Sequence, residues 1–183
     1  MKGKMYLSAD ELLGDSWRLA AKVRSAGWRP DVVVALWRGG ALPGVAVHEF
    51  LKATGWDVRH MPLKCGSYVA MGESAGAVQF SLLEETLASL VPGERALVVD
   101  DVFDSGRTIE AVAARMAEAG VEMRSACVYW KAAHNATGMR PDYFVKELGD
   151  DWIVFPHEME GLTSEELVGK DPLLAELVAG VAP

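Results

Sequence analysis

Apolar and polar positions follow two different spacings along the chain, and the two spacings alternate. After Ser8, apolar residues recur at the spacing of an amphipathic helix until about Gly27. Ser8 and Glu11 form a capping-box pattern at the start of this helix. Residues 32–36, in contrast, are continuously apolar and rich in valine, which is typical of a strand covered on both faces. The pattern therefore predicts that helices and strands alternate.

The same two spacings continue along the rest of the chain. Further helices are predicted over 43–53, 82–91 and 108–119, and further strands over 58–63, 96–99, 126–130 and 143–145. Residues 161–183 are predicted to form two short helices. The segment 66–80 consists largely of small residues without a clear period, which indicates a mobile functional loop or a hairpin.

This alternation predicts an α/β fold, an open, mostly parallel sheet with helices on both faces. We expect a single domain over residues 1–183, with its core at about 30–160 and a C-terminal helical segment at 161–183. In such sheets ligands bind at the carboxyl ends of the strands. The turns after Leu36 and after Val99 are therefore the expected places for a site.

Charge and composition exclude several classes of function. The chain has 18 Lys and Arg against 26 Asp and Glu, a formal net charge of −8, so its overall field does not suit a nucleic-acid backbone. Cys65 and Cys127 are too few for a disulfide framework. No apolar stretch fits a secretory signal or a membrane span. We therefore expect a cytoplasmic protein with neither a nucleic-acid nor a membrane partner.

The segment 96–108, ALVVDDVFDSGRT, carries the most specific chemistry. Its apolar half predicts a buried strand, which leads into the adjacent carboxylates of Asp100 and Asp101 and then into a helix. Ser105 and Thr108 place hydroxyls beside free N–H groups at the helix N-terminus, where a phosphate can bind. Acidic residues there would repel the phosphate unless they serve sugar hydroxyls and a divalent cation. The segment indicates a sugar-phosphate site with magnesium; the alternative is a solvated turn.

VVDDVFDSGRT resembles the 5-phosphoribosyl-1-pyrophosphate (PRPP) signature of the type I phosphoribosyltransferases, with Ser105 where threonine is commoner. The resemblance implies that Asp100 and Asp101 hold the ribose hydroxyls and their Mg²⁺ ion. It also implies that Asp104 is the catalytic acid/base facing N7 of a purine. The residues implied to hold the 5-phosphate are Ser105, Gly106, Arg107 and Thr108.

A second loop follows the first buried strand and reads Leu36-Trp37-Arg38-Gly39-Gly40. Its glycines let backbone N–H groups turn towards an anion, and Arg38 offers a fork of donors for a diphosphate. The loop is similar to the pyrophosphate loop of the same family, in which the peptide before the arginine can be cis. The resemblance thus implies that Arg38 and Gly39 bind PRPP.

Three later residues concern the acceptor of the transferred group. Lys131 can only donate, so it suits a 6-oxo group and opposes the 6-amino group of adenine. Trp152 offers a flat apolar surface on which a base can stack. The order of these residues resembles the 6-oxopurine phosphoribosyltransferases, and it implies a small purine-binding hood in which the backbone of Ile153 reads the purine 2-position. Glu158 would then lie near a second metal ion or the diphosphate, although His157 replaces the family's aromatic residue.

Ser67 and Tyr68 resemble the Ser-Tyr pair of the mobile loop that closes over PRPP in this family. No Lys, Arg or His occurs between Lys64 and Arg95, so this loop would contribute only hydroxyl and backbone groups. Excluding water matters because an oxocarbenium-like sugar is easily hydrolysed.

We therefore expect a purine phosphoribosyltransferase that joins hypoxanthine, guanine or xanthine to PRPP in purine salvage, as a homo-oligomer (dimer or tetramer). One alternative is a non-catalytic protein of the same fold that senses PRPP or a nucleotide. Another is a phosphoribosyltransferase for adenine, orotate or another pyrimidine, against which Lys131 and Trp152 argue. A hydrolase whose acids only hold magnesium is a third, and it leaves Arg38 and Lys131 without a role.

Overall fold

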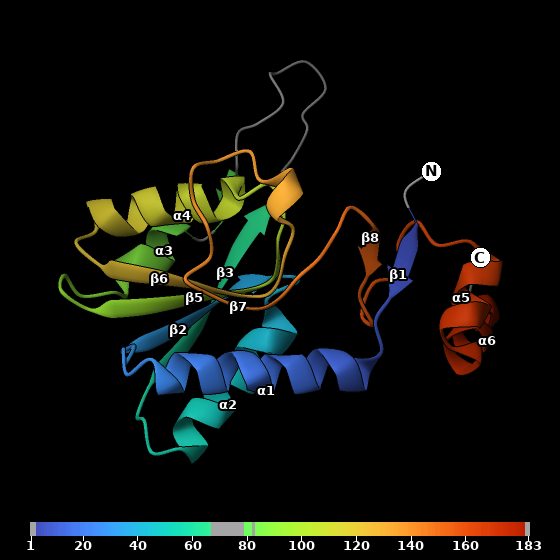
Figure 1. Ribbon diagram of the computed structural model, residues 1–183, viewed down its shortest axis with the longest axis horizontal. Coiled ribbons are helices and arrows are strands. Elements are labelled where there is room, and N and C mark those ends of the chain that lie inside the picture. Colours follow the sequence, from blue (N-terminus) through green and yellow to red (C-terminus); the bar gives the residue numbers. More distant parts are fainter. Residues whose placement is uncertain (1–2, 67–78, 82, 182–183) are drawn as a thin grey trace. The chain divides into compact units, whose positions relative to one another are not determined.

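The computed structural model describes residues 3–66, 79–81 and 83–181 (Figure 1). The chain divides into two compact units. The larger unit covers Asp10–Asp150, and the smaller unit combines the two ends of the chain, Met1–Ala9 and Asp151–Pro183. The unit with the main sheet therefore begins and ends earlier than the core expected at about 30–160, and a single domain over the whole chain stays a prediction.

The main sheet is open and mostly parallel, which confirms the predicted fold class. Within the described residues it has six strands in the order β4-β3-β2-β5-β6-β7, all paired in parallel except β4, which is antiparallel to β3. Its strands are β2 (Val32–Trp37), β3 (Arg59–Gly66), β4 (Gln79–Ser81), β5 (Arg95–Phe103), β6 (Glu122–Trp130) and β7 (Tyr143–Glu147). The valine-rich centres of β2 and β5 are fully buried, as expected of strands covered on both faces.

Helices cover both faces of this sheet. Figure 1 shows α1 (Ala9–Ser25) and α2 (Ala41–Ala53) on one face, and α3 (Leu83–Ala88) and α4 (Arg107–Glu118) on the other. The apolar stripe predicted for the first helix is buried, with Leu12, Leu19 and Val23 at most 2% exposed. In the described parts of the chain, no helix combines the length and the apolar character needed to cross a membrane.

Strand β5 is longer than the sequence pattern predicts. The pattern places the end of the strand at Val99 and a polar turn from Asp100 onward, but β5 continues to Phe103. The reason is that β6 continues beside it, with Val102 opposite Tyr129 and Phe103 opposite Trp130. The adjacent carboxylates therefore lie on a strand held on one side by a neighbour, and not on a turn.

The smaller unit contains a second, parallel pair of strands and two helices. Residues of β1 (Lys4–Tyr6) pair with β8 (Trp152–Val154), Met5 lying opposite Ile153. The two short helices predicted for the C-terminal segment are confirmed as α5 (Ser164–Lys170) and α6 (Pro172–Val181). A capping box between Thr163 and Glu166 begins α5.

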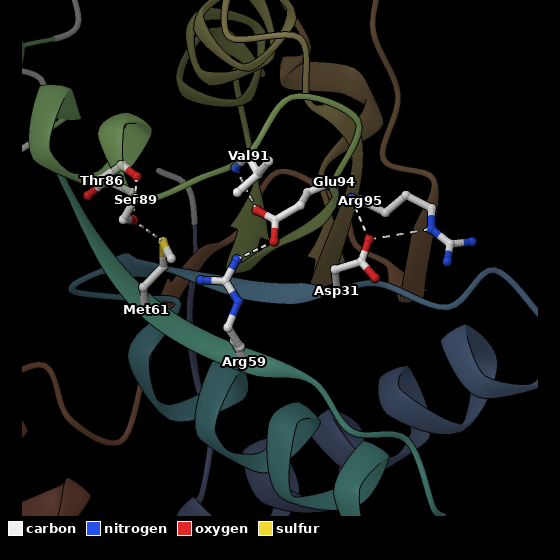
Figure 2. Close-up of polar contacts among 8 residues, drawn as sticks. All are labelled: Asp31, Arg59, Met61, Thr86, Ser89, Val91, Glu94 and Arg95. Carbon is white, nitrogen blue, oxygen red and sulfur yellow. Dashed lines mark hydrogen bonds and ion pairs between the residues drawn. The ribbon is translucent and has the colours of Figure 1, made fainter.

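Charged residues at the amino ends of the strands pair with one another (Figure 2). Arg59 at the start of β3 forms an ion pair with Glu94, whose other oxygen accepts from the N–H of Val91 at 2.8 Å. The N–H of Arg95 donates to Asp31 at 2.8 Å. These partly exposed pairs contribute about 0–1 kcal/mol each, so their main effect is to link the starts of β2, β3 and β5.

A buried carboxylate joins α1 to the strands β6 and β7 of the sheet. Asp15 is fully buried and accepts hydrogen bonds from the Tyr129 hydroxyl at 2.9 Å, from Lys146 Nζ at 2.7 Å and from Arg18 at 2.6 Å. Burial by itself would raise the pKa of Asp15, but the three donors outweigh it and hold the pKa below its usual value of 3.8. Asp15 therefore stays ionised and connects α1 with β6 and β7.

Replacing Asp15 with asparagine should lower the free energy of unfolding at neutral pH by roughly 2–3 kcal/mol, because the donors lose a buried anion. Since the folded-state pKa is depressed, the carboxylate stabilises the protein above pH 3.8, and this stabilisation is lost as the pH falls through the lower folded value. Urea unfolding should thus show a difference between the two proteins that shrinks below about pH 4. Asp10→Asn, at an exposed position of α1, is the control, and an equal loss in both variants would contradict the assignment.

Candidate active site

The two predicted loops meet at the carboxyl ends of β2 and β5. The Trp37–Arg38 peptide is cis, as the resemblance of this loop to a pyrophosphate loop allows. A side-chain carbon added to Gly39 would lie 2.3 Å from Oδ2 of Asp101. One added to Gly40 would lie 2.3 Å from the carbonyl oxygen of Val99 and 2.8 Å from that of Leu36. Both glycines are therefore needed for the loop to approach the end of β5 this closely.

The carboxylates of Asp100 and Asp101 are adjacent in sequence on the last part of β5. Asp101 is 7% exposed, and its Oδ1 accepts from the N–H of Val102 at 2.7 Å. Burial raises the pKa of Asp100 well above its usual value, and the neighbouring charge of Asp101 raises it further. Burial and the same two carboxylates also raise the pKa of the Cys127 thiol, which lies opposite Asp100 on β6. The two carboxylates therefore lie close enough to oppose each other's ionisation.

A metal ion fits this pair of carboxylates. In the described residues no group of three or more His, Cys, Asp and Glu side chains could hold a metal by itself. Mg²⁺ commonly takes one or two carboxylates and completes its shell with water and substrate oxygens. A divalent cation would also relieve the repulsion that raises the pKa of Asp100. The donor set thus fits a magnesium ion that arrives with an anionic substrate.

The loop before α4 is shaped for close contact. Gly106 is the N-cap of α4 and has φ 81°, a left-handed conformation that favours glycine. A side chain there would lie 2.5 Å from the Thr137 hydroxyl and 2.8 Å from the Phe103 ring. A glycine cap offers no side-chain acceptor, so no side chain of the N-cap pairs with the first N–H groups of the helix, beside Ser105 and Thr108. This arrangement suits the binding of an anion.

Asp104 does not stand alone, because it contacts a histidine that the sequence pattern does not single out. His134 Nδ1 lies 2.8 Å from Oδ1 of Asp104, and His134 Nε2 lies 3.1 Å from Oδ1 of Asp150. His134 ends a short 3₁₀ helix, Ala132–His134, just after β6, and Asp150 follows β7. Both residues could have been found from the sequence, because they are polar residues that follow the carboxyl ends of predicted strands. The same criterion identified the turns after Leu36 and Val99.

Lys131 follows β6 directly and is buried, with only 4% of its surface exposed. Its N–H donates to the carbonyl of Phe103 at 2.9 Å, which anchors it beside the end of β5. Among the described residues its ammonium group has no hydrogen-bond or ion-pair partner. An ammonium group only donates hydrogen bonds, so this position favours a ligand that brings an acceptor.

The remaining predicted residues belong to the smaller unit. Trp152 and Ile153 are on β8, where Trp152 is 60% exposed and Ile153 is buried. Glu158 is in the same unit, and its carboxylate accepts from the N–H of Phe155 at 3.1 Å. His157 stacks on Phe155, with ring centres 5.7 Å apart. Ser67 and Tyr68 fall outside the described residues.

The structure thus brings most of the predicted residues together on the larger unit. Arg38, Gly39, Asp100, Asp101, Asp104, Ser105, Gly106, Arg107, Thr108 and Lys131 all follow or end the parallel strands β2, β5 and β6. Trp152, Ile153 and Glu158 are part of the other unit. Adjacent carboxylates, an open helix start, an arginine loop and a buried lysine form a candidate site for an anionic sugar and a ligand with an acceptor group.

Comparison with known proteins places the chain among phosphoribosyltransferases. A model of the phosphoribosyl transferase domain matches residues 3–162. A xanthine-guanine phosphoribosyltransferase of Desulfotalea psychrophila is 30% identical over 172 residues, which cover 90% of this chain and 92% of that protein. An adenine phosphoribosyltransferase of Sphingopyxis alaskensis is 31% identical over 135 residues, covering 68% of this chain and 70% of that protein.

A solved structure shares the fold as well. The purine phosphoribosyltransferase of Pyrococcus horikoshii superposes with a TM-score of 0.68 and 28% identity, covering 87% of this chain and 97% of that one. These findings agree with the family that the sequence motifs indicate.

Proposed function

This chain belongs to the phosphoribosyl transferase domain family and is an enzyme of that type, and we propose that it transfers the phosphoribosyl group of PRPP to a 6-oxopurine. The products would be a nucleoside 5′-monophosphate and diphosphate, as in purine salvage. The observation that carries the choice of acceptor is the place of Lys131, directly after β6 at the carboxyl edge of the sheet. Its ammonium group only donates, so it suits a 6-oxo group and opposes a 6-amino group.

The two loops support the binding of PRPP. We assign the ribose hydroxyls and Mg²⁺ to Asp100 and Asp101, and the diphosphate to Arg38 and Gly39. The 5-phosphate is assigned to the start of α4, with the residues Ser105, Gly106, Arg107 and Thr108. The open helix start and the close packing of Gly39 against Asp101 support these assignments. Ser67 and Tyr68 keep their proposed place in a closing loop.

The residues of the smaller unit keep the roles proposed for them towards the purine and the diphosphate. Trp152 is exposed enough to stack on a base, and the buried position of Ile153 leaves its backbone to read the purine 2-position. Glu158 is proposed to lie near a second metal ion or the diphosphate. Because one of its oxygens already accepts from Phe155, only part of its carboxylate is available for that role.

The proposed reaction breaks the bond between the anomeric carbon and the diphosphate oxygen ahead of attack by the purine. Positive charge then grows on the ribose ring, and the carboxylates of Asp100 and Asp101 stabilise it. Mg²⁺, when bound, would neutralise charge on the diphosphate. Arg38 donates to the same leaving group. Asp104 accepts the proton from N7, so that N9 can attack.

Adenine is the second candidate acceptor, because the Sphingopyxis alaskensis relative is an adenine phosphoribosyltransferase. That relative covers a smaller share of the chain than the xanthine-guanine enzyme. In this chain, an adenine acceptor would leave the Lys131 ammonium facing a 6-amino group, two donors against each other. We therefore favour a 6-oxopurine.

The test is a panel of bases with purified protein, PRPP and Mg²⁺, followed by absorbance. We expect turnover with hypoxanthine, guanine or xanthine. For adenine we expect a kcat/KM at least about 100-fold lower, because its 6-amino donor would face the donor Lys131. Lys131→Met should reduce this preference, whereas Lys52→Met on the exposed part of α2 should not. Turnover with adenine or orotate alone would refute the 6-oxopurine acceptor. Binding of PRPP without turnover of any base would favour a sensing protein.

A homo-oligomer, dimer or tetramer, and a cytoplasmic location stay part of the proposal. The α6 helix supports a subunit contact, because Leu173, Leu177 and Val181 are 62%, 60% and 84% exposed and recur on one side of the helix. Such a stripe of apolar side chains is more stable when another surface covers it.

A further inference from the structure

Three segments that follow neighbouring strands meet at His134. Its Nδ1 contacts Asp104, which follows β5, and its Nε2 contacts Asp150, which follows β7. The ring is largely covered, with a side-chain exposure of 23%, while the side chains of Asp104 and Asp150 are 46% and 62% exposed. The histidine is thus the least exposed member of an Asp-His-Asp group at the carboxyl edge of the sheet.

The segment that carries the histidine is held to the loop before α4 at several points. The His134 N–H donates to the carbonyl of Lys131, and the Lys131 N–H donates to the carbonyl of Phe103. The N–H of Ala136 donates to the carbonyl of Ser105 at 2.9 Å. The ring therefore has a defined position relative to Asp104, because backbone bonds on both sides of it reach the same loop.

The contact with Asp104 defines the role of Nδ1. A carboxylate oxygen accepts, so Nδ1 carries a proton and donates it to a hydrogen bond with Oδ1 of Asp104. Nε2 lies 3.1 Å from Oδ1 of Asp150 on the other side of the ring.

We propose that His134 is a positioning residue for the base Asp104, a role that rests on the proposed function. The Nδ1–H donates to Oδ1 of Asp104 and leaves Oδ2 to accept a proton from the purine. Asp150 holds the ring from the other side. Without the histidine, the half-exposed carboxylate of Asp104 is free to take other rotamers, and fewer of them face the acceptor.

Three variants of His134 separate this role from a structural one. Asparagine places an amide donor near the position of Nδ1 and keeps the bond to Asp104, whereas glutamine places its donor near Nε2 and loses that bond. We expect His134→Ala and His134→Gln to lower kcat about tenfold with less than about a twofold change in KM for PRPP, and His134→Asn to retain most of the wild-type kcat. His60→Asn, an exposed position on β3, serves as the control and should match the wild type.

A double variant tests whether the histidine acts through the aspartate. In an Asp104→Ala background, His134→Ala should change kcat by less than about twofold, because the group that it positions is gone. An equal effect of His134→Ala in both backgrounds would overturn the proposal. So would equal values of kcat for His134→Asn and His134→Gln, or a wild-type kcat in His134→Ala.

A spectroscopic measurement makes the test independent of turnover. In ¹⁵N–¹H spectra of the wild-type protein, the His134 ring, assigned by its loss in His134→Asn, should carry a proton on Nδ1 whose resonance shifts in Asp104→Ala. A ring without a proton on Nδ1 would overturn the proposal even if the enzyme were inactive. If instead the wild type binds PRPP but converts none of the bases while Nδ1 carries its proton, the proposed function fails and the contact between His134 and Asp104 stands.

Discussion

Replacing Asp104 with alanine is expected to lower kcat by about 100- to 1,000-fold and to change KM for PRPP only slightly, because a positioned base typically contributes about 10²–10⁴-fold. Asp104 lies one residue beyond the end of β5 and contacts His134, not the groups assigned to PRPP. Its removal should therefore affect the proton transfer more than the binding of the sugar. Steady-state kinetics with PRPP and the best acceptor from the base panel measure both constants.

Two controls make this result specific. Asp31→Asn removes a partly exposed carboxylate that pairs with Arg95 at the amino end of the sheet (Figure 2), and should leave kcat unchanged. Asp104→Asn preserves the shape of the side chain, and its kcat should be nearly as low as that of the alanine variant, because an amide is not a base at neutral pH. Near-normal turnover in either Asp104 variant would contradict the assignment of the base.

Replacing Gly40 with alanine is expected to lower the free energy of unfolding by about 3 kcal/mol and to reduce the PRPP-dependent activity strongly. The backbone of Gly40 has φ −69° and ψ −6°, which alanine adopts easily, so the effect comes only from space. The added carbon would lie 2.3 Å from the Val99 carbonyl oxygen and 2.9 Å from the Leu36 nitrogen. These are backbone atoms of two central strands and cannot move aside cheaply.

Gly138→Ala is the matched control for Gly40→Ala. It makes the same chemical change in a loop of the same unit, but nothing lies within 4 Å of the added carbon. Urea unfolding should show a large loss of stability for Gly40→Ala and almost none for Gly138→Ala. Similar stability of the two variants would mean that the Arg38 loop can move away from β5, and the close packing described for it would be wrong.

The features that could be predicted from the sequence are those that neighbouring residues determine by themselves. The valine-rich run 32–36 must be a buried strand because its side chains have no polar face. Gly106 marks a left-handed turn, and Ser105 and Thr108 beside it mark an open helix start, so a few adjacent positions suffice to recognise the loop proposed to bind a phosphate. The resemblance of ALVVDDVFDSGRT to a PRPP signature is local in the same sense, and the family that it indicates is the one to which the chain belongs.

Strand length and pairing depend on residues far away in the sequence. The strand containing Asp100 continues to Phe103 because β6 pairs with it, and nothing in the local polarity of this segment indicates that. The pairing of β1 with β8 joins the two ends of the chain, Lys4 lying opposite Trp152, and neither short strand stands out by its own pattern. The buried position of Asp15 is another example, since its donors Tyr129 and Lys146 lie on the far strands.

The fold class, the order of the main elements and the loop that marks the family thus follow from the sequence alone. The contacts of Asp104 and Asp150 with His134, and the burial of Lys131, became apparent only in the folded chain. The physical reason is the difference between local and long-range interactions. Hydrophobic period, glycine conformation and helix capping act within a few residues, whereas these contacts arise only when the parallel strands β5, β6 and β7 bring their carboxyl ends to one edge.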